Sequence, residues 1–206
     1  MASTNIKKSA EKATIDCVMI VLRPRDTEHY EAVGTDSDTQ IQVEANVETS
    51  EAVRLVIKDV LKAQKKAKTT LTGHTITLTE GMTVLEFLPL LTGATLTKDA
   101  NDKIIGYEPP ASGERVELPV FDMDCYSAVY SGAELIEYEK ITYPNCTGDQ
   151  IAPPGSQDGT FRSNDIKIIS APGNGVAPYT VAYIAPEDLP TLVDALEDAE
   201  EEQNNG

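Results

Sequence analysis

The chain has 206 residues and a formal net charge of −17 at pH 7, since 34 Asp and Glu outnumber 17 Lys and Arg. This charge argues against a nucleic-acid-binding protein and against docking on anionic membranes, because both partners are bound mainly through Lys and Arg. No stretch reaches the roughly 18 apolar residues of a membrane span, and no signal-peptide pattern follows the N-terminus. We therefore expect one large domain that folds in a cytoplasm.

The three cysteines are too few and too widely spaced for a disulfide framework. Cys17, Cys125 and Cys146 are expected as buried or half-buried thiols in a reducing compartment.

The N-terminal third of the chain predicts a polar arm followed by strands. Residues 1–13 are polar and are expected to form a flexible arm, and residues 14–22 form an apolar run of strand length. Arg23-Pro24-Arg25 ends that strand, and residues 26–38 are expected as an acidic loop.

Two later segments alternate between apolar and polar residues, which is typical of half-buried strands. The first has Ile41, Val43, Ala45 and Val47 on one face, and the second, residues 69–79, has His74, Ile76 and Leu78 on one face. Between them, residues 53–61 predict a further strand, although a helix remains open there.

A run of lysines lies between these strands, in an otherwise acidic chain. Four cations fall within seven residues: Lys62, Lys65, Lys66 and Lys68. One interpretation is a solvated hairpin tip. The other is an inter-subunit contact, in which the lysines dock onto an acidic patch of a neighbouring copy.

Residues 83–93 predict a short helix. Thr83 and Glu86 have the spacing of a capping box, and Gly93 is a natural C-terminal stop. Pro89 removes a backbone donor within this segment, so the helix must be short or kinked.

The rest of the chain predicts more strands and a last helix. A turn at 99–103 precedes strands near 103–108, 115–130, 134–143, 161–170 and 179–185, and Pro119 should interrupt the second of these or mark it as an edge. Residues 186–206 predict a helix and an acidic tail. Its apolar residues have helical spacing: Leu189, Leu192, Val193 and Leu196. The fold class is therefore mainly β, an antiparallel sandwich or barrel with one short flanking helix and a C-terminal helix.

No pattern of a catalytic, metal or cofactor site stands out. His29 and His74 are far apart in the sequence, and phosphate-loop, nucleophile-elbow and zinc motifs are absent. We expect no enzyme activity and no cofactor.

Several segments are similar to one family. These are residues 70–79 (TLTGHTITLT), 90–93 (LLTG), 143–148 (YPNCTG), 158–161 (DGTF) and 168–172 (IISAP). Their order, over about residues 50–185, resembles the major tail tube proteins of long-tailed bacteriophages and prophages of Gram-positive bacteria.

The resemblance implies a tail-tube-like β-sandwich at residues 14–185, with a long hairpin extension at 39–79. It also implies hexameric rings that stack into a hollow tube, through which phage DNA passes without sequence-specific binding. The implied partners are further copies of the chain and the tape-measure, terminator and distal tail proteins. The implied location is the tail of the virion, after assembly in the host cytoplasm.

Two other functions remain open. A carbohydrate- or cell-surface-binding β-sandwich would need exposed aromatic residues, and the chain has no Trp, 3 Phe and 8 Tyr. A hydrolase of an unrecognised type would need a reactive thiol at Cys125 or Cys146.

Overall fold

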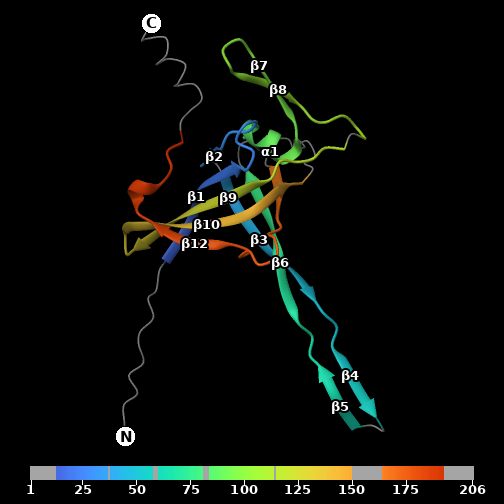
Figure 1. The fold of residues 1–206 in the computed structure, drawn as a ribbon. Helices are drawn as coiled ribbons and strands as arrows, with labels where there is room; N and C mark the ends of the chain where they lie inside the picture. Colours follow the sequence, from blue (N-terminus) through green and yellow to red (C-terminus); the bar gives the residue numbers. More distant parts are fainter. Residues whose placement is uncertain are drawn as a thin grey trace, which may run out of the picture.

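A computed structural model describes residues 13–36, 38–57, 60–80, 84–113, 115–149 and 164–192 (Figure 1). Its main feature is one curled antiparallel sheet, shaped like half a barrel, with a single short α-helix packed on it. The mainly β antiparallel fold predicted from the sequence is therefore confirmed. The flexible arm expected at the N-terminus lies outside the described residues, except for Ala13, which begins the first strand.

Eight strands form the curled sheet. In chain order they are β1 (Ala13–Pro24), β2 (Val33–Thr35), β3 (Asp38–Thr49), β6 (Thr69–Glu80), β9 (Phe121–Ser131), β10 (Glu134–Gly148), β11 (Asn164–Ser170) and β12 (Thr180–Ile184). The spatial order is β2-β1-β9-β10-β11-β6-β3, and β12 pairs with the first part of β10. The acidic loop expected at 26–38 thus contains a short strand, β2, which pairs with β1.

A bend in β10 lets this strand serve two neighbours. Residues 138–142 pair with β12, and residues 146–148 pair with β11. Between them, Asn145 has φ 55°, and the pairing with β9 shifts register between Tyr143 and Cys146. The backbone N–H of Asn145 donates to Oδ1 of Asp122 at 2.8 Å, and this hydrogen bond holds the backbone at the bend in place.

The core lies on the concave side of the sheet, where the strands and the helix meet. Its fully buried members come from β1, β6, β9, β10, β11 and the helical segment at 85–92, and include Ile20, Leu22, Ile76, Leu78, Leu91, Phe121 and Ile168. The predicted common face of His74, Ile76 and Leu78 is confirmed, since all three are buried. The predicted half-buried face of β3 is wrong for Val43, Ala45 and Val47, which are exposed, and only Ile41 is half-buried.

The helix is short because a 3-10 turn precedes it and Gly93 ends it. A 3-10 turn, η1 (Leu85–Phe87), leads into α1 (Leu88–Thr92). Pro89 lies in the first turn of α1, where its missing N–H removes no hydrogen bond, and Gly93 ends the helix in a left-handed conformation at φ 71°. The capping box is not formed as predicted, because Val84 is the N-cap and makes no side-chain hydrogen bond; Thr83 lies outside the described residues.

Two hairpins stand apart from the curled sheet. One is β4 (Val53–Ile57) with β5 (Val60–Lys65), and the other is β7 (Thr95–Lys98) with β8 (Ile104–Glu108). The single strand predicted over 53–61 is therefore wrong, because β4 and β5 are separate strands. The turn predicted at 99–103 is confirmed between β7 and β8. The strand predicted to begin at 115 begins at Phe121, after Pro119.

The C-terminal helix predicted from residue 186 is corrected by the structure. Only one 3-10 turn forms, η2 (Pro186–Asp188), and Leu189 is extended with ψ 129°. Leu192 then lies beside Gly34 of β2, where its Cδ2 is 2.5 Å from the position of a Cβ on that glycine. Residues 186–192 thus run from β12 to β2, and over these residues the tertiary contact takes the place of the first turns of the predicted helix. Residues 193–206 lie outside the described residues.

Candidate functional site

A long two-stranded projection is the feature that sets this chain apart from a simple sandwich. β6 pairs with both β3 and β11 up to His74, which lies opposite Ser170 at the end of β11. Beyond that point β6 keeps only β3 as a neighbour, and the pair continues into β4 and β5. We call residues 46–73 the extension. It points away from the curled sheet (Figure 1).

The base of the extension is fixed by a close backbone contact. A Cβ on Gly73 would lie 2.0 Å from the carbonyl oxygen of Ser170, so only glycine fits there. The β3–β6 register also shifts at this point, between Asn46 and Val47. Thr72 Oγ1 donates to the Asn46 carbonyl at 2.9 Å, and Thr75 Oγ1 donates to Asn46 Oδ1 at 3.1 Å. The bulge and its hydrogen bonds therefore set the direction in which the extension leaves the sheet.

Apolar side chains on the extension are open to solvent. The large exposed ones are Val47 (54%), Val53 (60%), Val56 (55%) and Leu71 (39%). A two-stranded hairpin is only marginally stable by itself in water, and contiguous exposed apolar surface is typical of interaction sites. The extension therefore has the composition of a surface that is buried against another molecule.

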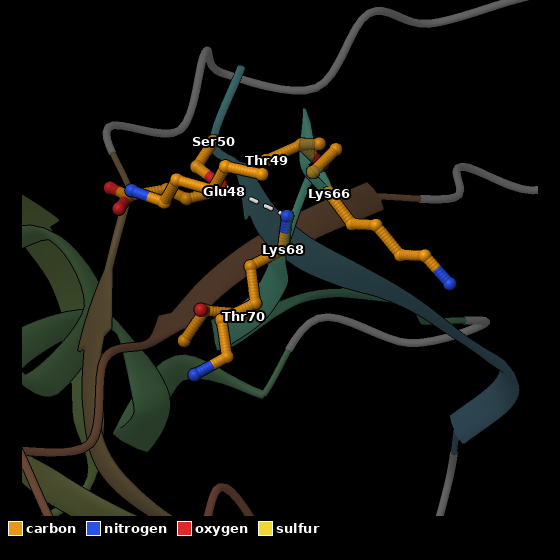
Figure 2. Close-up of a pocket in the computed structure, with 8 residues that line it drawn as sticks. Glu48, Thr49, Ser50, Lys66, Lys68 and Thr70 are labelled. Carbon is orange, nitrogen blue, oxygen red and sulfur yellow. Dashed lines mark hydrogen bonds between the residues drawn. The ribbon is translucent and has the colours of Figure 1, made fainter. Parts of the chain in front are cut away.

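Three of the four lysines singled out in the sequence lie together at a bend of the extension. They surround a depression of about 630 Å³ with Glu48, Thr49 and Ser50 (Figure 2). The three, Lys65, Lys66 and Lys68, are called the lysine patch. Among the described residues no carboxylate lies within ion-pair distance of their ammonium groups. Their positive charge is thus available to an outside partner.

The fourth lysine, Lys62, lies farther along β5 and does not line the depression. The lysines are also not at the hairpin tip, as one interpretation of the sequence had it, because the tip lies between Ile57 and Val60.

Two hydrogen bonds between Ser50 and Lys68 join the chain at the bend that carries the patch. The Lys68 N–H donates to Ser50 Oγ at 2.9 Å, and the Ser50 N–H donates to the Lys68 carbonyl at 2.9 Å. The ladder resumes only at Val53 and Lys65. The Lys66 side chain extends away from the other labelled residues (Figure 2).

A buried ionic cluster on the outer face of the sheet was missed by the sequence analysis. Asp124 of β9 is fully buried and forms ion pairs with Arg23 of β1 and with Lys140 of β10, the latter at 3.0 Å. Thr142 Oγ1 donates to Asp124 Oδ1 at 2.5 Å, and the Tyr126 hydroxyl donates to Oδ2 at 3.3 Å. Burial and the adjacent Asp124 raise the pKa of Tyr126 to about 12. The cluster joins three strands, and its single carboxylate is paired with two cations.

The two histidines lie in different environments. His29 is exposed after β1, with its Nδ1 2.8 Å from Asp26 Oδ2. His74 is buried at the base of the extension, edge-on to Tyr143 and Tyr179 with ring centroids 5.5 and 5.6 Å away. Burial lowers the pKa of His74 below its ordinary value, while a hydrogen bond to the Pro178 backbone opposes this. Its Nδ1 has no hydrogen-bond partner among the described residues, so the neutral ring is favoured.

The three cysteines are partly or fully shielded from solvent. Cys17 is half-buried, and Cys125 and Cys146 are buried, as predicted. Burial raises the pKa of the Cys146 thiol to about 12, so the thiol is protonated at neutral pH and is a poor nucleophile. In the part of the chain that the structure describes, no group of three His, Cys, Asp or Glu side chains could hold a metal ion. No helix there is long and apolar enough to cross a membrane.

Comparisons with solved structures give a weak similarity. No family model matches the sequence, and no curated protein matches it. Among solved structures, the chain is similar to the tube-terminating cap of the anti-feeding prophage, determined by cryo-EM. The TM-score is 0.43 and the sequence identity 13%, over 88% of this chain and 99% of that one.

Proposed function

We propose that this chain is a structural subunit that self-assembles into stacked hexameric rings, forming a hollow tail tube through which phage DNA passes. The proposal follows from the resemblance of the sequence to major tail tube proteins. The observation that supports it most directly is the extension, whose exposed valines and leucine need a partner surface to be buried.

The curled sheet also suits such a role. β12 lies at an edge, since among the described residues it pairs only with β10, and its Val181 and Tyr183 are exposed. An unpaired edge strand readily pairs with a strand of another chain. Subunits that contribute curled sheets to a ring would bury such edges.

The rest of the proposal follows from the same role. The subunit would have no enzyme activity, and its location would be the virion tail, after assembly in the host cytoplasm. Its partners would be further copies of itself and the tape-measure, terminator and distal tail proteins. The net charge of −17 would repel DNA phosphates, so DNA would pass without sequence-specific contacts.

Electron microscopy of the purified chain over a concentration series tests the proposal. We expect stacked rings or hollow tubes whose amount rises with protein concentration. The double variant Val53→Ser and Val56→Ser should assemble far less. A matched control is Val176→Ser, which removes an equally exposed valine in a turn far from the extension in the sequence. Dispersed monomers at every concentration, or equal loss in the control, would contradict the proposal.

One observation favours the alternative of a carbohydrate- or cell-surface-binding module. Three tyrosines have exposed rings: Tyr107, Tyr179 and Tyr183. Exposed aromatic rings can stack on sugars, although Tyr179 is in ring contact with His74, and the Tyr183 hydroxyl donates to Glu139 at 2.9 Å. Saturable glycan binding by a monomer that does not assemble would support this alternative over the tube.

A further inference from the structure

The charge of this chain is distributed in two opposed segments. Residues 50–69 contain six cations and two acids, so the distal part of the extension has a net charge of +4 in a chain of net charge −17. The six cations are Arg54, Lys58, Lys62, Lys65, Lys66 and Lys68. By contrast, residues 193–206 contain six acids and no Lys or Arg. These acids are Asp194, Glu197, Asp198, Glu200, Glu201 and Glu202.

We propose that the lysine patch binds the acidic C-terminal segment, residues 193–206, of another copy of this chain. The inference rests on the self-assembly proposed above and deepens it, because it names the partner of one surface of the extension. The binding energy would come from exposed, opposite charges, and each such pair contributes little alone. Three lysines around one depression would meet several carboxylates at once.

The positions of the two segments favour binding between two copies over binding within one copy. Leu192, the last residue the structure describes, lies on the body beside Gly34 of β2. The patch lies roughly 26 Å beyond Ile41, which packs against the core, because β3 rises about 3.3 Å for each of the eight residues to Thr49. Asp194 follows Leu192 by two residues and can reach only about 7 Å from it.

Even Glu202 can reach at most about 35 Å from Leu192 with the chain fully extended. Figure 1 shows the last described residues and the extension on opposite sides of the sheet. These placements favour contact of the acids with the patch of another copy over contact with their own patch. Such a contact is heterologous, since each copy offers its patch to one neighbour and its C-terminal segment to another, and contacts of this kind build rings or filaments.

Binding of a labelled peptide tests the inference. A fluorescent peptide of residues 193–206 is titrated with the full-length chain at low and high salt, and its anisotropy is recorded. We expect saturable binding that weakens strongly as salt rises, because exposed charges are screened. The triple variant Lys65→Glu, Lys66→Glu, Lys68→Glu should bind the peptide at least ten-fold more weakly.

A matched control keeps the total charge change the same. Lys98→Glu, Lys103→Glu and Lys167→Glu reverse three other exposed lysines and should change the affinity less than two-fold. Equal weakening by both triple variants would mean that only net charge matters, and would overturn the inference. A peptide with Glu200→Lys, Glu201→Lys and Glu202→Lys should recover binding to the patch variant but not to the wild type.

Two further comparisons test the identity of the bound segment. A full-length chain with Asn or Gln at its six tail acids should bind the peptide as the wild type does at low concentration. Tighter binding would mean that each patch holds its own tail, and would overturn the assignment to another copy. A DNA oligonucleotide that binds the patch as tightly as the peptide would make it a general anion site, which also overturns the inference.

Electron microscopy of the patch variant separates this inference from the proposed function. If the wild type and the patch variant form the same tubes and neither binds the peptide, the tail contact is wrong and the tube proposal stands. If the wild type binds the peptide through the patch but no tubes form, the contact is right and the tube proposal fails.

Discussion

One strand, β6, belongs to two regions that differ in how their side chains are buried. In the body of the sheet, Ile76 and Leu78 are fully buried under the helix and β11, whereas Leu71 on the extension is 39% exposed. The sequence of β6 has similar β-branched and apolar residues in both parts. The difference arises from the neighbours, because β11 ends at Ser170 and leaves the extension with one partner strand. The face of β6 in the body is therefore buried within the single chain, whereas its face on the extension has apolar surface left to bury.

The largest effect on stability should come from a substitution at the contact between α1 and the sheet. A Cβ on Gly148 would lie 2.0 Å from the carbonyl oxygen of Leu91, and neither backbone can move without disturbing the core. Gly148→Ala should lower the free energy of unfolding by about 3 kcal/mol, as strong overpacking does. Urea denaturation measures this change. Gly106→Ala is the control, since its Cβ would meet nothing within 4 Å, and it should change the free energy by less than about 0.5 kcal/mol. Equal effects would mean that α1 does not pack as the structure shows.

The next largest effect should come from the ionic cluster on the outer face. Asp124→Asn leaves Arg23 and Lys140 facing each other without a carboxylate, and should cost about 2 kcal/mol of unfolding free energy, because the two cations keep part of their solvation. Thermal and urea unfolding measure the change. Asp102→Asn removes a carboxylate from the exposed ion pair with Lys98 and should cost at most about 0.5 kcal/mol. If Asp124→Asn leaves the free energy of unfolding unchanged, the cluster does not stabilise the folded chain.

The features that the sequence predicted correctly are local ones. Alternation located the buried face of β6, and Gly93 located the end of the helix. The helix predicted from residue 186 is wrong over 186–192, because Leu192 packs on Gly34, a contact between residues 158 positions apart that overrides helical spacing. The single strand over 53–61 failed because the two residues between Ile57 and Val60 are neither Gly nor Pro, so the sequence does not mark the break between β4 and β5.

The candidate site was predicted in part, because only its local features can be read from the sequence. The lysines are neighbours in the sequence, so their charge was visible, but the bend at Ser50 and Lys68 decides that only three of them surround the depression. The Asp124 cluster was not predictable, because Arg23 of β1 lies 101 positions before Asp124 and only the strand pairing brings the two together.

A smaller effect should appear at the base of the extension, where the two regions join. His74 is buried beside Tyr143 and Tyr179, and its pKa is lowered mainly by burial. The unfolded chain binds a proton near pH 6.5 while the folded chain resists it, so stability is lost as the pH falls below 6.5. His74→Phe should be less stable than the wild type at pH 7.5, and the gap should narrow toward pH 5. Unfolding free energies of both proteins at several pH values measure the gap. A gap that is constant with pH would mean that His74 titrates normally in the folded chain.

The smallest effect on stability should come from the extension itself. Val53→Ser with Val56→Ser removes apolar side chains that are already 60% and 55% exposed, so the free energy of unfolding of the monomer should change by less than about 0.5 kcal/mol. Urea denaturation at a concentration below that of assembly measures this, and Ile76→Ala, in the buried part of β6, should cost about 3 kcal/mol in the same assay. A loss near that size in the double valine variant would mean that these valines are buried in the single chain and that the extension folds as part of the body. If the monomer is unaffected while assembly is lost, the valines act between copies, because the same substitutions then cost free energy only in the assembled state.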